Sequence, residues 1–142
     1  MRDFRLRASG LTVQYGGATV LRGLDVAIPD GGFTAIVGPN GSGKSSLLKA
    51  LGRLLLPSAG TVTLDGRAIA TFRTVELARL LGLLPQSAQA PEGLTVGDLV
   101  ARGRYPHQSF LRQWSGADQA AVQAALAMTG LAELAGRAVE TL

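Results

Sequence analysis

Alternating apolar and polar positions mark the first part of the chain as β structure. Residues 11–15 read LTVQY, and Leu24, Val26 and Ile28 repeat the alternation before the turn sequence PDGG. Residues that alternate in this way point to opposite faces of a strand that has one buried face. Two half-buried strands are therefore predicted within residues 11–28.

Longer apolar patterns follow. The run FTAIV at residues 33–37 is typical of a strand covered on both faces, as in a parallel sheet. Leucines at helical spacing predict a helix over residues 45–56, which Pro57 and Gly60 end. Residues 61–66 predict a further strand and turn, and residues 76–81 a helix. The short apolar run LGLLPQ at residues 81–86 predicts another strand.

After residue 86 the patterns are helical. A short helix is predicted from Thr95, then a loop over residues 104–114, then an alanine-rich helix over residues 118–128. Ser115 and Asp118 are predicted to cap that helix and to place an acid in its first turn. The expected organisation is a β-rich nucleotide-binding part to residue 86 and a helical part over residues 87–142.

Length and composition exclude several classes. The chain has 142 residues, enough for one domain or part of one. It has no run of about 18 apolar residues and no apolar core of a secretory signal near its first residue. Without cysteine it has no disulfide or thiolate metal site, which permits a cytosolic location. The net charge is +4, but the arginines are scattered, so no nucleic-acid surface is predicted.

The candidate for chemistry is the stretch GPNGSGKSS at residues 38–46. It matches the phosphate-binding pattern G-x-x-x-x-G-K-[ST] between a predicted strand and a predicted helix, which is the context that the pattern requires. Glycines let successive backbone amides turn toward an anion, and the helix start adds a partial positive charge. Lys44 is predicted to bind the β- and γ-phosphates of a nucleotide, and Ser45 to offer its hydroxyl to Mg²⁺.

The predicted nucleotide-binding residues of this loop are Gly38, Pro39, Asn40, Gly41, Ser42, Gly43, Lys44, Ser45 and Ser46. The structural alternative is a glycine-rich turn between a strand and a helix that matches the pattern by accident. Because Gly makes up only about 7% of average sequences, such a match is expected to be rare in a chain of this length.

The whole chain resembles the ATP-binding subunits of ABC transporters. The resemblance rests on GPNGSGKSSLL, on LARLLGLLPQ and on TVGDLVARGRYPH. The portion RGRYPHQSFLRQWSGAD is most similar to the branch that imports iron–siderophore complexes, with haem and cobalamin importers nearby. The resemblance implies an α/β fold, a P-loop NTPase of ABC type with a β-rich first part, a partial parallel-sheet core and a helical subdomain.

The same resemblance implies cofactors, partners and further site residues. It implies ATP and Mg²⁺ as cofactors, and membrane permease subunits as partners at the cytoplasmic face of the membrane. Tyr15 matches the ring that stacks on adenine, with a residue packed in the sheet as the alternative. Gln86 matches the Q-loop glutamine, whose amide reaches Mg²⁺ and the attacking water. Lys44 and Gln86 are thus the predicted catalytic residues, and Ser45 and Gln86 the predicted Mg²⁺ ligands.

The resemblance also implies that the chain is the first part of a longer ATPase, with Leu142 at the start of the signature motif. WSGADQ and His107 do not match the signature or the switch histidine. Hydrolysis is therefore expected of the full-length parent, facing a second ATP-binding subunit head to tail, and not of these 142 residues. Two alternatives stay open, a module that binds ATP without hydrolysing it and a small P-loop kinase. The roughly 30 residues of β structure before the loop disfavour the kinase.

Overall fold

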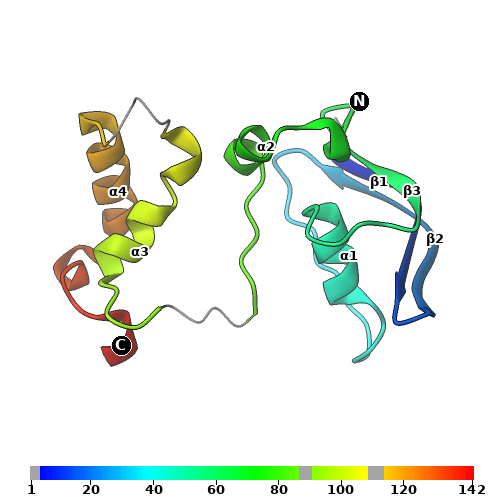
Figure 1. Cartoon of the computed structure of the whole chain (residues 1–142), viewed down its shortest axis with the longest axis horizontal. Helices are drawn as coiled ribbons and strands as arrows, with labels where there is room; N and C mark the ends of the chain where they lie inside the picture. Colours follow the sequence, from blue (N-terminus) through cyan, green and yellow to red (C-terminus); the bar gives the residue numbers. More distant parts are fainter. Residues whose placement is uncertain (1–3, 87–90, 109–113) are drawn as a thin grey trace. The chain divides into compact units, whose positions relative to one another are not determined.

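A computed structural model describes residues 4–86, 91–108 and 114–142 of the chain. It forms two compact units, Met1–Leu77 and Ala78–Leu142, each described here by itself (Figure 1). The boundary between the units falls inside α2 (Thr74–Leu80). The division of roles at residue 86 stays a prediction. No helix within the described ranges is long and apolar enough to cross a membrane.

The first unit is built on a four-stranded sheet with the order β2-β1-β3-β4. Its strands are β1 (Phe4–Tyr15), β2 (Ala18–Pro29), β3 (Ala59–Leu64) and β4 (Arg67–Ala68), and a 3-10 turn, η1 (Ile69–Thr71), leads from β4 to α2. All pairings in this sheet are antiparallel. The alternating sequence patterns at residues 11–15 and 24–28 therefore predicted β1 and β2 correctly. Both paired strands extend beyond the alternating residues, β1 back to Phe4 and β2 back to Ala18.

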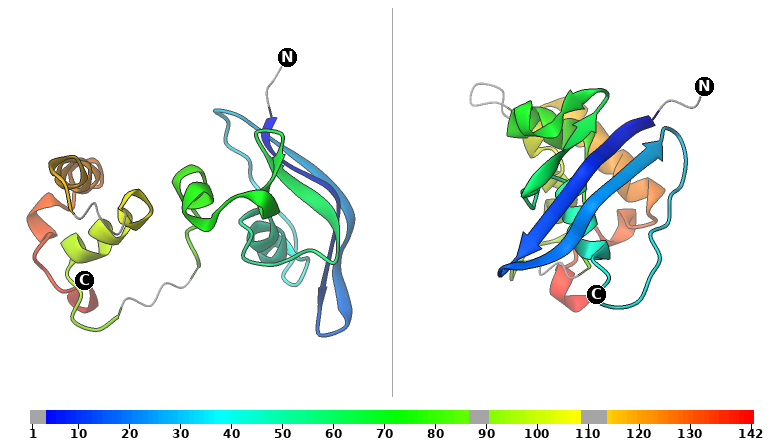
Figure 2. Two further views of the ribbon diagram at one scale, coloured as in Figure 1. Left: turned by 45° about the horizontal axis from the view of Figure 1, so that its top comes forward. Right: turned by 90° about the vertical axis from the view of Figure 1, so that its right-hand side faces the viewer.

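The helix α1 (Lys44–Leu51) lies against one face of this curved sheet (Figure 2). It contacts β1 and β2 and buries three apolar side chains, of Leu47, Ala50 and Leu51. In β1, Ala8 and Leu11 are both buried although strict alternation would point them to opposite faces. A shift of pairing register between these two residues, a β-bulge, turns both toward the core.

The helix that carries the glycine-rich loop ends at Leu51, earlier than the predicted residue 56. Arg53 adopts a left-handed conformation with φ +58° and turns the chain away from the helix axis. The N–H of Leu54 then donates to the carbonyl of Lys49 at 2.7 Å. A left-handed residue followed by such backward hydrogen bonds is a common way to end a helix.

The predicted strand at residues 33–37 does not form, so this prediction was wrong. The side chains of Phe33 and Val37 are 96% and 88% exposed. Residues 81–86 also have no strand structure, and Leu84 is 90% exposed. A strand needs backbone partners along its edge, and none of the described residues pairs with either segment. The sheet that does form is antiparallel and uses other residues.

The second unit is helical in its described residues. After α2 come α3 (Val96–Arg102), η2 (Tyr105–His107), α4 (Gly116–Met128), η3 (Ala132–Leu134) and η4 (Val139–Thr141). The helices predicted from Thr95 and over residues 118–128 are thus confirmed. His107, which was expected in a loop, lies in η2. The predicted loop over residues 104–114 lies partly outside the described residues.

A small apolar core holds this unit together. Val96 from α3 packs with Val122 and Leu126 from α4, and all three are buried. The C-terminal segment returns to the start of α3, where Thr95 forms a β-bridge with Ala138. Because these contacts join residues far apart in sequence, the two helices and the C-terminal turns form one packed unit.

Both helices of the second unit begin with a capping box. At α3 the hydroxyl of Thr95 accepts from the Asp98 amide, and the Asp98 carboxylate accepts from the Thr95 amide. At α4 the same reciprocal pair joins Ser115 and Asp118. The predicted cap at Ser115 is therefore confirmed, and the acid in the first turn also favours the helix dipole.

Asp118 is buried and fully hydrogen bonded. Its Oδ2 accepts from the Ser115 hydroxyl at 2.6 Å and from the Ser115 amide at 3.0 Å. Its Oδ1 accepts from Arg104 Nε at 2.9 Å. These hydrogen bonds, from Ser115 first and from Arg104 second, lower the pKa of Asp118 to about 2.

We expect the second unit to lose stability as the pH falls from about 4 toward 2. Because the pKa of Asp118 in the folded chain is below that of an unfolded Asp, about 3.9, its stabilising contribution is complete above that value and lost through the folded pKa. Asp118→Asn removes this part of the acid dependence. Thermal unfolding followed by circular dichroism between pH 2 and pH 7 measures it, with Glu133→Gln as an exposed carboxylate control. The same acid dependence in Asp118→Asn and the wild-type chain would contradict the prediction.

Candidate functional site

The glycine-rich loop runs directly into the first turn of α1. Gly43 is the N-cap residue, with a left-handed φ of +89°, and no side chain caps the helix. The amide of Leu47 donates to the Gly43 carbonyl at 2.8 Å and opens the helical hydrogen-bond series. The amides of Lys44, Ser45 and Ser46 come before it and have no partner within the helix, as at any helix start. They are donors available to an anion.

Lys44 folds back into the loop. Its Nζ donates to the carbonyls of Gly38 at 2.8 Å and Pro39 at 2.6 Å. A longer contact of 3.5 Å joins it to the Ser42 hydroxyl. These contacts hold the ammonium between the start of the loop and the start of the helix. A cation in this position meets any anion that binds the first-turn amides.

A side chain at Gly43 would be crowded by β2 and strained by the left-handed backbone. A Cβ on it would lie 2.8 Å from Leu21 Cδ2 and 3.3 Å from the Val20 carbonyl oxygen, both in β2. The end of the loop is therefore held against the sheet by close backbone approach. The sequence pattern did not indicate Val20 and Leu21, because alternation predicted the strand only near residues 24–28. No local signal connects Val20 with Gly43, which lies 23 positions later in the sequence.

The rest of the loop is open and polar. Pro39, Asn40, Gly41 and Ser45 are exposed, and Ser46 is half-buried. Among the described residues no group of three acidic or histidine side chains could hold a metal ion. A Mg²⁺ ion at this loop would therefore depend on the Ser45 hydroxyl and on oxygens of a bound phosphate, which is how this ion is usually held. The residues present fit a phosphate ligand with Mg²⁺.

Tyr15 ends β1 at the turn of the β1–β2 hairpin. It lies opposite Ala18, and its side chain is 72% exposed, so the alternative of a ring packed within the sheet was wrong. Val20 and Leu21, which approach Gly43, belong to the same end of β2. The hairpin end that carries the ring is thus also the end that holds the loop.

Gln86 is exposed and belongs to the second unit. Since each unit is described by itself, the role of this amide at a nucleotide stays a prediction.

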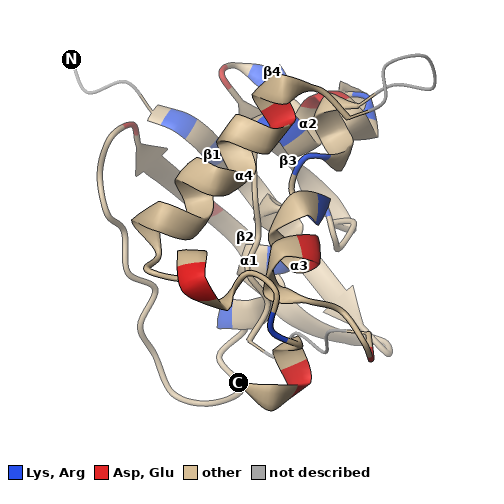
Figure 3. Ribbon diagram, turned by 90° about the vertical axis from the view of Figure 1, so that its left-hand side faces the viewer, with Lys and Arg blue, Asp and Glu red and all other residues tan. Residues whose placement is uncertain are grey.

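The basic residues lie on separate elements, including β1, β2, α1, α2 and α3 (Figure 3). This distribution agrees with the scattered arginines of the sequence.

The chain matches known proteins along almost all of its length. The model of the ABC transporter family matches residues 21–142. The ferric enterobactin transport ATP-binding protein FepC of Escherichia coli is 51% identical over 138 residues, which are 97% of this chain and 51% of that protein. The petrobactin import ATP-binding protein FpuD of Bacillus anthracis is 48% identical over 137 residues, 96% of this chain and 50% of that protein. The chain spans about half the length of these curated relatives.

A solved structure supports the fold class. A nucleotide-free ATP-binding cassette from an ABC transporter aligns with a TM-score of 0.75 and 26% identity, over 99% of this chain and 59% of that one. The predicted fold class, an α/β P-loop NTPase of ABC type, is thereby confirmed.

Proposed function

The chain belongs to the ABC transporter family, and from this premise we propose that it binds ATP with Mg²⁺ at residues 38–46 as the energy-coupling part of an importer. The observation that carries this proposal is the ammonium of Lys44, held within the loop at the start of α1. The unpartnered first-turn amides and the open Ser45 hydroxyl complete a site for phosphate and Mg²⁺.

In that proposal the lysine, the backbone amides and the Ser45 hydroxyl of the loop have separate roles. Lys44 exchanges the carbonyls of Gly38 and Pro39 for β- and γ-phosphate oxygens. The backbone amides from Gly41 to Ser46 donate to the phosphates, and the Ser45 hydroxyl binds Mg²⁺. ATP supplies a phosphoanhydride bond whose cleavage can drive transport, and these residues bind and orient it.

Gln86 and a second ATP-binding subunit belong to the proposed activity of the whole protein. Its amide is proposed to contact Mg²⁺ and to orient the attacking water, while a facing subunit completes the site. The second candidate is a module that binds ATP without hydrolysing it. Phosphate release measured on a purified assembly that contains this chain, with a Lys44→Ala assembly as control, separates the two.

We propose an iron–siderophore complex as the cargo, with membrane permease subunits as partners at the cytoplasmic face. The names of two relatives near 50% identity, for ferric enterobactin and petrobactin, support this class. A chimera tests it. This chain replaces the matching half of FepC in Escherichia coli cells that lack FepC, and growth on ferric enterobactin as the iron source is measured.

Restored growth, absent from the chimera with Lys44→Ala, is the expected result. No growth from a chimera that is produced and binds ATP would argue against the siderophore class. In that case the same exchange into haem and cobalamin importers tests the two alternatives.

We expect Tyr15→Ala to weaken binding of ATP and GTP alike, by about 1–3 kcal/mol if the exposed ring stacks on a base. Stacking needs only a π-face, so the identity of the base should matter little. Fluorescence titration with labelled ATP and GTP measures both affinities. Tyr15→Phe keeps the ring and should bind normally. Normal binding of both nucleotides by Tyr15→Ala would show that the ring takes no part.

A further inference from the structure

Arg53 is an arginine in a backbone conformation that usually requires glycine. It follows Gly52, the C-cap residue of α1, and has φ +58°, the left-handed position that ends the helix. A side chain with a Cβ is strained there, and glycine is the usual residue. A strained non-glycine residue that persists is a reason to ask what its side chain does.

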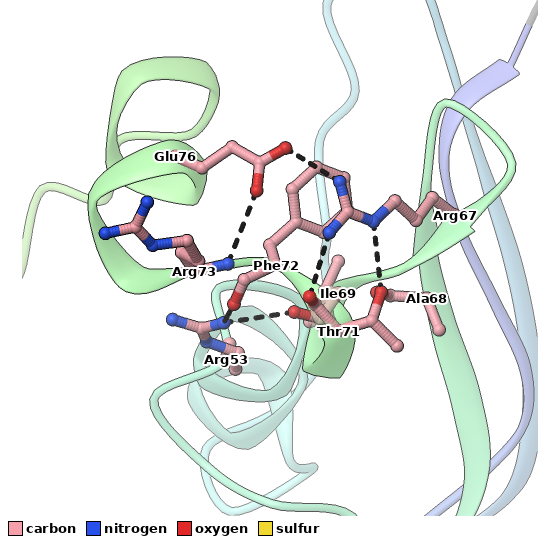
Figure 4. Close-up of polar contacts among 8 residues, drawn as sticks. All are labelled: Arg53, Arg67, Ala68, Ile69, Thr71, Phe72, Arg73 and Glu76. Atoms are coloured by element: carbon pink, nitrogen blue, oxygen red, sulfur yellow. Dashed lines mark hydrogen bonds and ion pairs between the residues drawn. The ribbon is translucent and has the colours of Figure 1, made fainter.

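The guanidinium of Arg53 contacts three residues of the segment that leads into α2, and Figure 4 shows two of these contacts, those with Ile69 and Phe72. Its Nη1 donates to the Ile69 carbonyl at 3.1 Å and to the Phe72 carbonyl at 2.6 Å. Its Nη2 donates to the Thr74 hydroxyl at 3.0 Å, and Thr74 is the first residue of α2. The side chain of Arg53 therefore connects the C-terminal end of α1 with η1 and with the start of α2.

A second arginine holds the same segment from the sheet side. Arg67 donates to the Thr71 carbonyl at 2.8 Å and to Glu76 Oε1 at 2.7 Å, and its guanidinium lies 4.0 Å over the Phe72 ring (Figure 4). Glu76 in turn accepts from the Arg73 amide at 3.4 Å. Arg67 thus joins residues 71–76 to the β3–β4 hairpin, whereas Arg53 joins them to α1.

We propose that Arg53 is a positioning residue that transmits nucleotide binding at the loop to η1 and the start of α2. The inference rests on the proposed ATP binding. The helix α1 has only eight residues, so the phosphate loop and Arg53 lie at opposite ends of one short, rigid element. A ligand that orders the first turn of α1 therefore also favours the state in which Arg53 holds residues 69–74. Glycine at this position could end the helix but could not make this connection.

Hydrogen exchange measured by mass spectrometry tests this connection in the 142-residue chain, with and without Mg²⁺ and a non-hydrolysable ATP analogue. Arg53→Gly keeps the left-handed backbone and removes the guanidinium. Arg73→Ala is the matched control, since it also removes one positive charge, and Arg73 contributes only its backbone amide to the contacts of Figure 4. Each variant is first titrated with the analogue, and exchange is then compared at the same multiple of its own Kd. Because coupling is reciprocal, Arg53→Gly should bind the analogue more weakly than the wild-type chain, and Arg73→Ala should bind it normally.

The ATP analogue is added at 100 times its Kd. If it binds only the state in which residues 69–80 are held, it lowers their rate of hydrogen exchange by up to about 100-fold in the wild-type chain and in Arg73→Ala. In Arg53→Gly we expect slowing of less than about threefold there, while α1 keeps its full response. Arg53→Lys, which keeps the charge without the planar fork, should fall between them. A purely structural arginine would change the exchange rates without changing their dependence on ATP.

Three results overturn the inference. One is an undiminished ATP response of residues 69–80 in Arg53→Gly, and another is ATP binding by the wild-type chain without any response there. Unchanged ATP affinity in Arg53→Gly is the third, since a coupling through Arg53 must act in both directions. If circular dichroism shows that Arg53→Gly does not fold, a full response in Arg53→Lys overturns the inference instead. Failure of the wild-type chain to bind ATP appears in the titration and refutes the proposed function first.

Discussion

Lys44→Ala is expected to lower the affinity of the chain for ATP by about 10- to 150-fold, because hydrogen bonds to charged groups contribute about 1.5–3 kcal/mol each. The ammonium already lies inside the loop, 2.8 Å and 2.6 Å from the Gly38 and Pro39 carbonyls. Its removal takes away both the phosphate partner and the group that holds the two ends of the loop together. Titration with a fluorescent ATP analogue in the presence of Mg²⁺ measures the loss.

The chain offers a matched control for this variant. Lys49 is its other lysine, exposed in the last turn of the same helix. Lys49→Ala removes the same charge from the other end of α1 and should bind the analogue normally. Equal affinities of Lys44→Ala and Lys49→Ala would refute the assignment of the loop as the nucleotide site.

Gly60→Ala is expected to destabilise the first unit by at least about 2 kcal/mol, since overpacking commonly costs about 1–3 kcal/mol and a left-handed L-residue about 1–2 kcal/mol. An added Cβ would lie 2.3 Å from the Gly10 carbonyl oxygen and 2.6 Å from that of Ser9. Both are backbone atoms of β1, which cannot rotate away. The β1–β3 pairing would have to separate at this point.

Comparison with Gly66→Ala separates the steric cost of Gly60→Ala from its conformational cost. Gly66 has φ +79°, close to the +84° of Gly60, but nothing lies within 4 Å of its added Cβ. It should therefore carry only the conformational cost, about 1–2 kcal/mol. Thermal unfolding followed by circular dichroism compares the two, and a domain of this size should melt about 4–8 °C lower per kcal/mol. Equal melting temperatures would show that the strands separate freely near Gly60.

Local pairs of residues were predicted well from the sequence. The capping box of Ser115 and Asp118 spans three positions, and the alternation in β1 and β2 spans a few more. In such cases the partners that satisfy the backbone are near neighbours in the chain, so the pattern alone contains the information. The glycines, lysine and serines of residues 38–46 are also contiguous, and their role as the nucleotide site stays a prediction.

The run at residues 33–37 was predicted wrongly for the opposite reason. Its apolar residues indicate burial on two faces, but a strand exists only where another segment supplies hydrogen bonds along its edge. The sequence of a strand does not specify that partner. Within the described residues the pairing partners of β1 are β2 and β3, and Phe33 stays 96% exposed.

By itself, then, the sequence determined the helix caps and the alternating strands, each of which depends on residues close together in the chain. It predicts the phosphate-binding role of residues 38–46 on the same kind of local pattern. Only the tertiary structure decided that Gly43 lies close against β2, that Gly60 must be a glycine against β1, and that Arg53 ends α1 and reaches the start of α2. The physical reason is that steric exclusion and side-chain reach depend on distances between segments, and these distances exist only after the chain has folded.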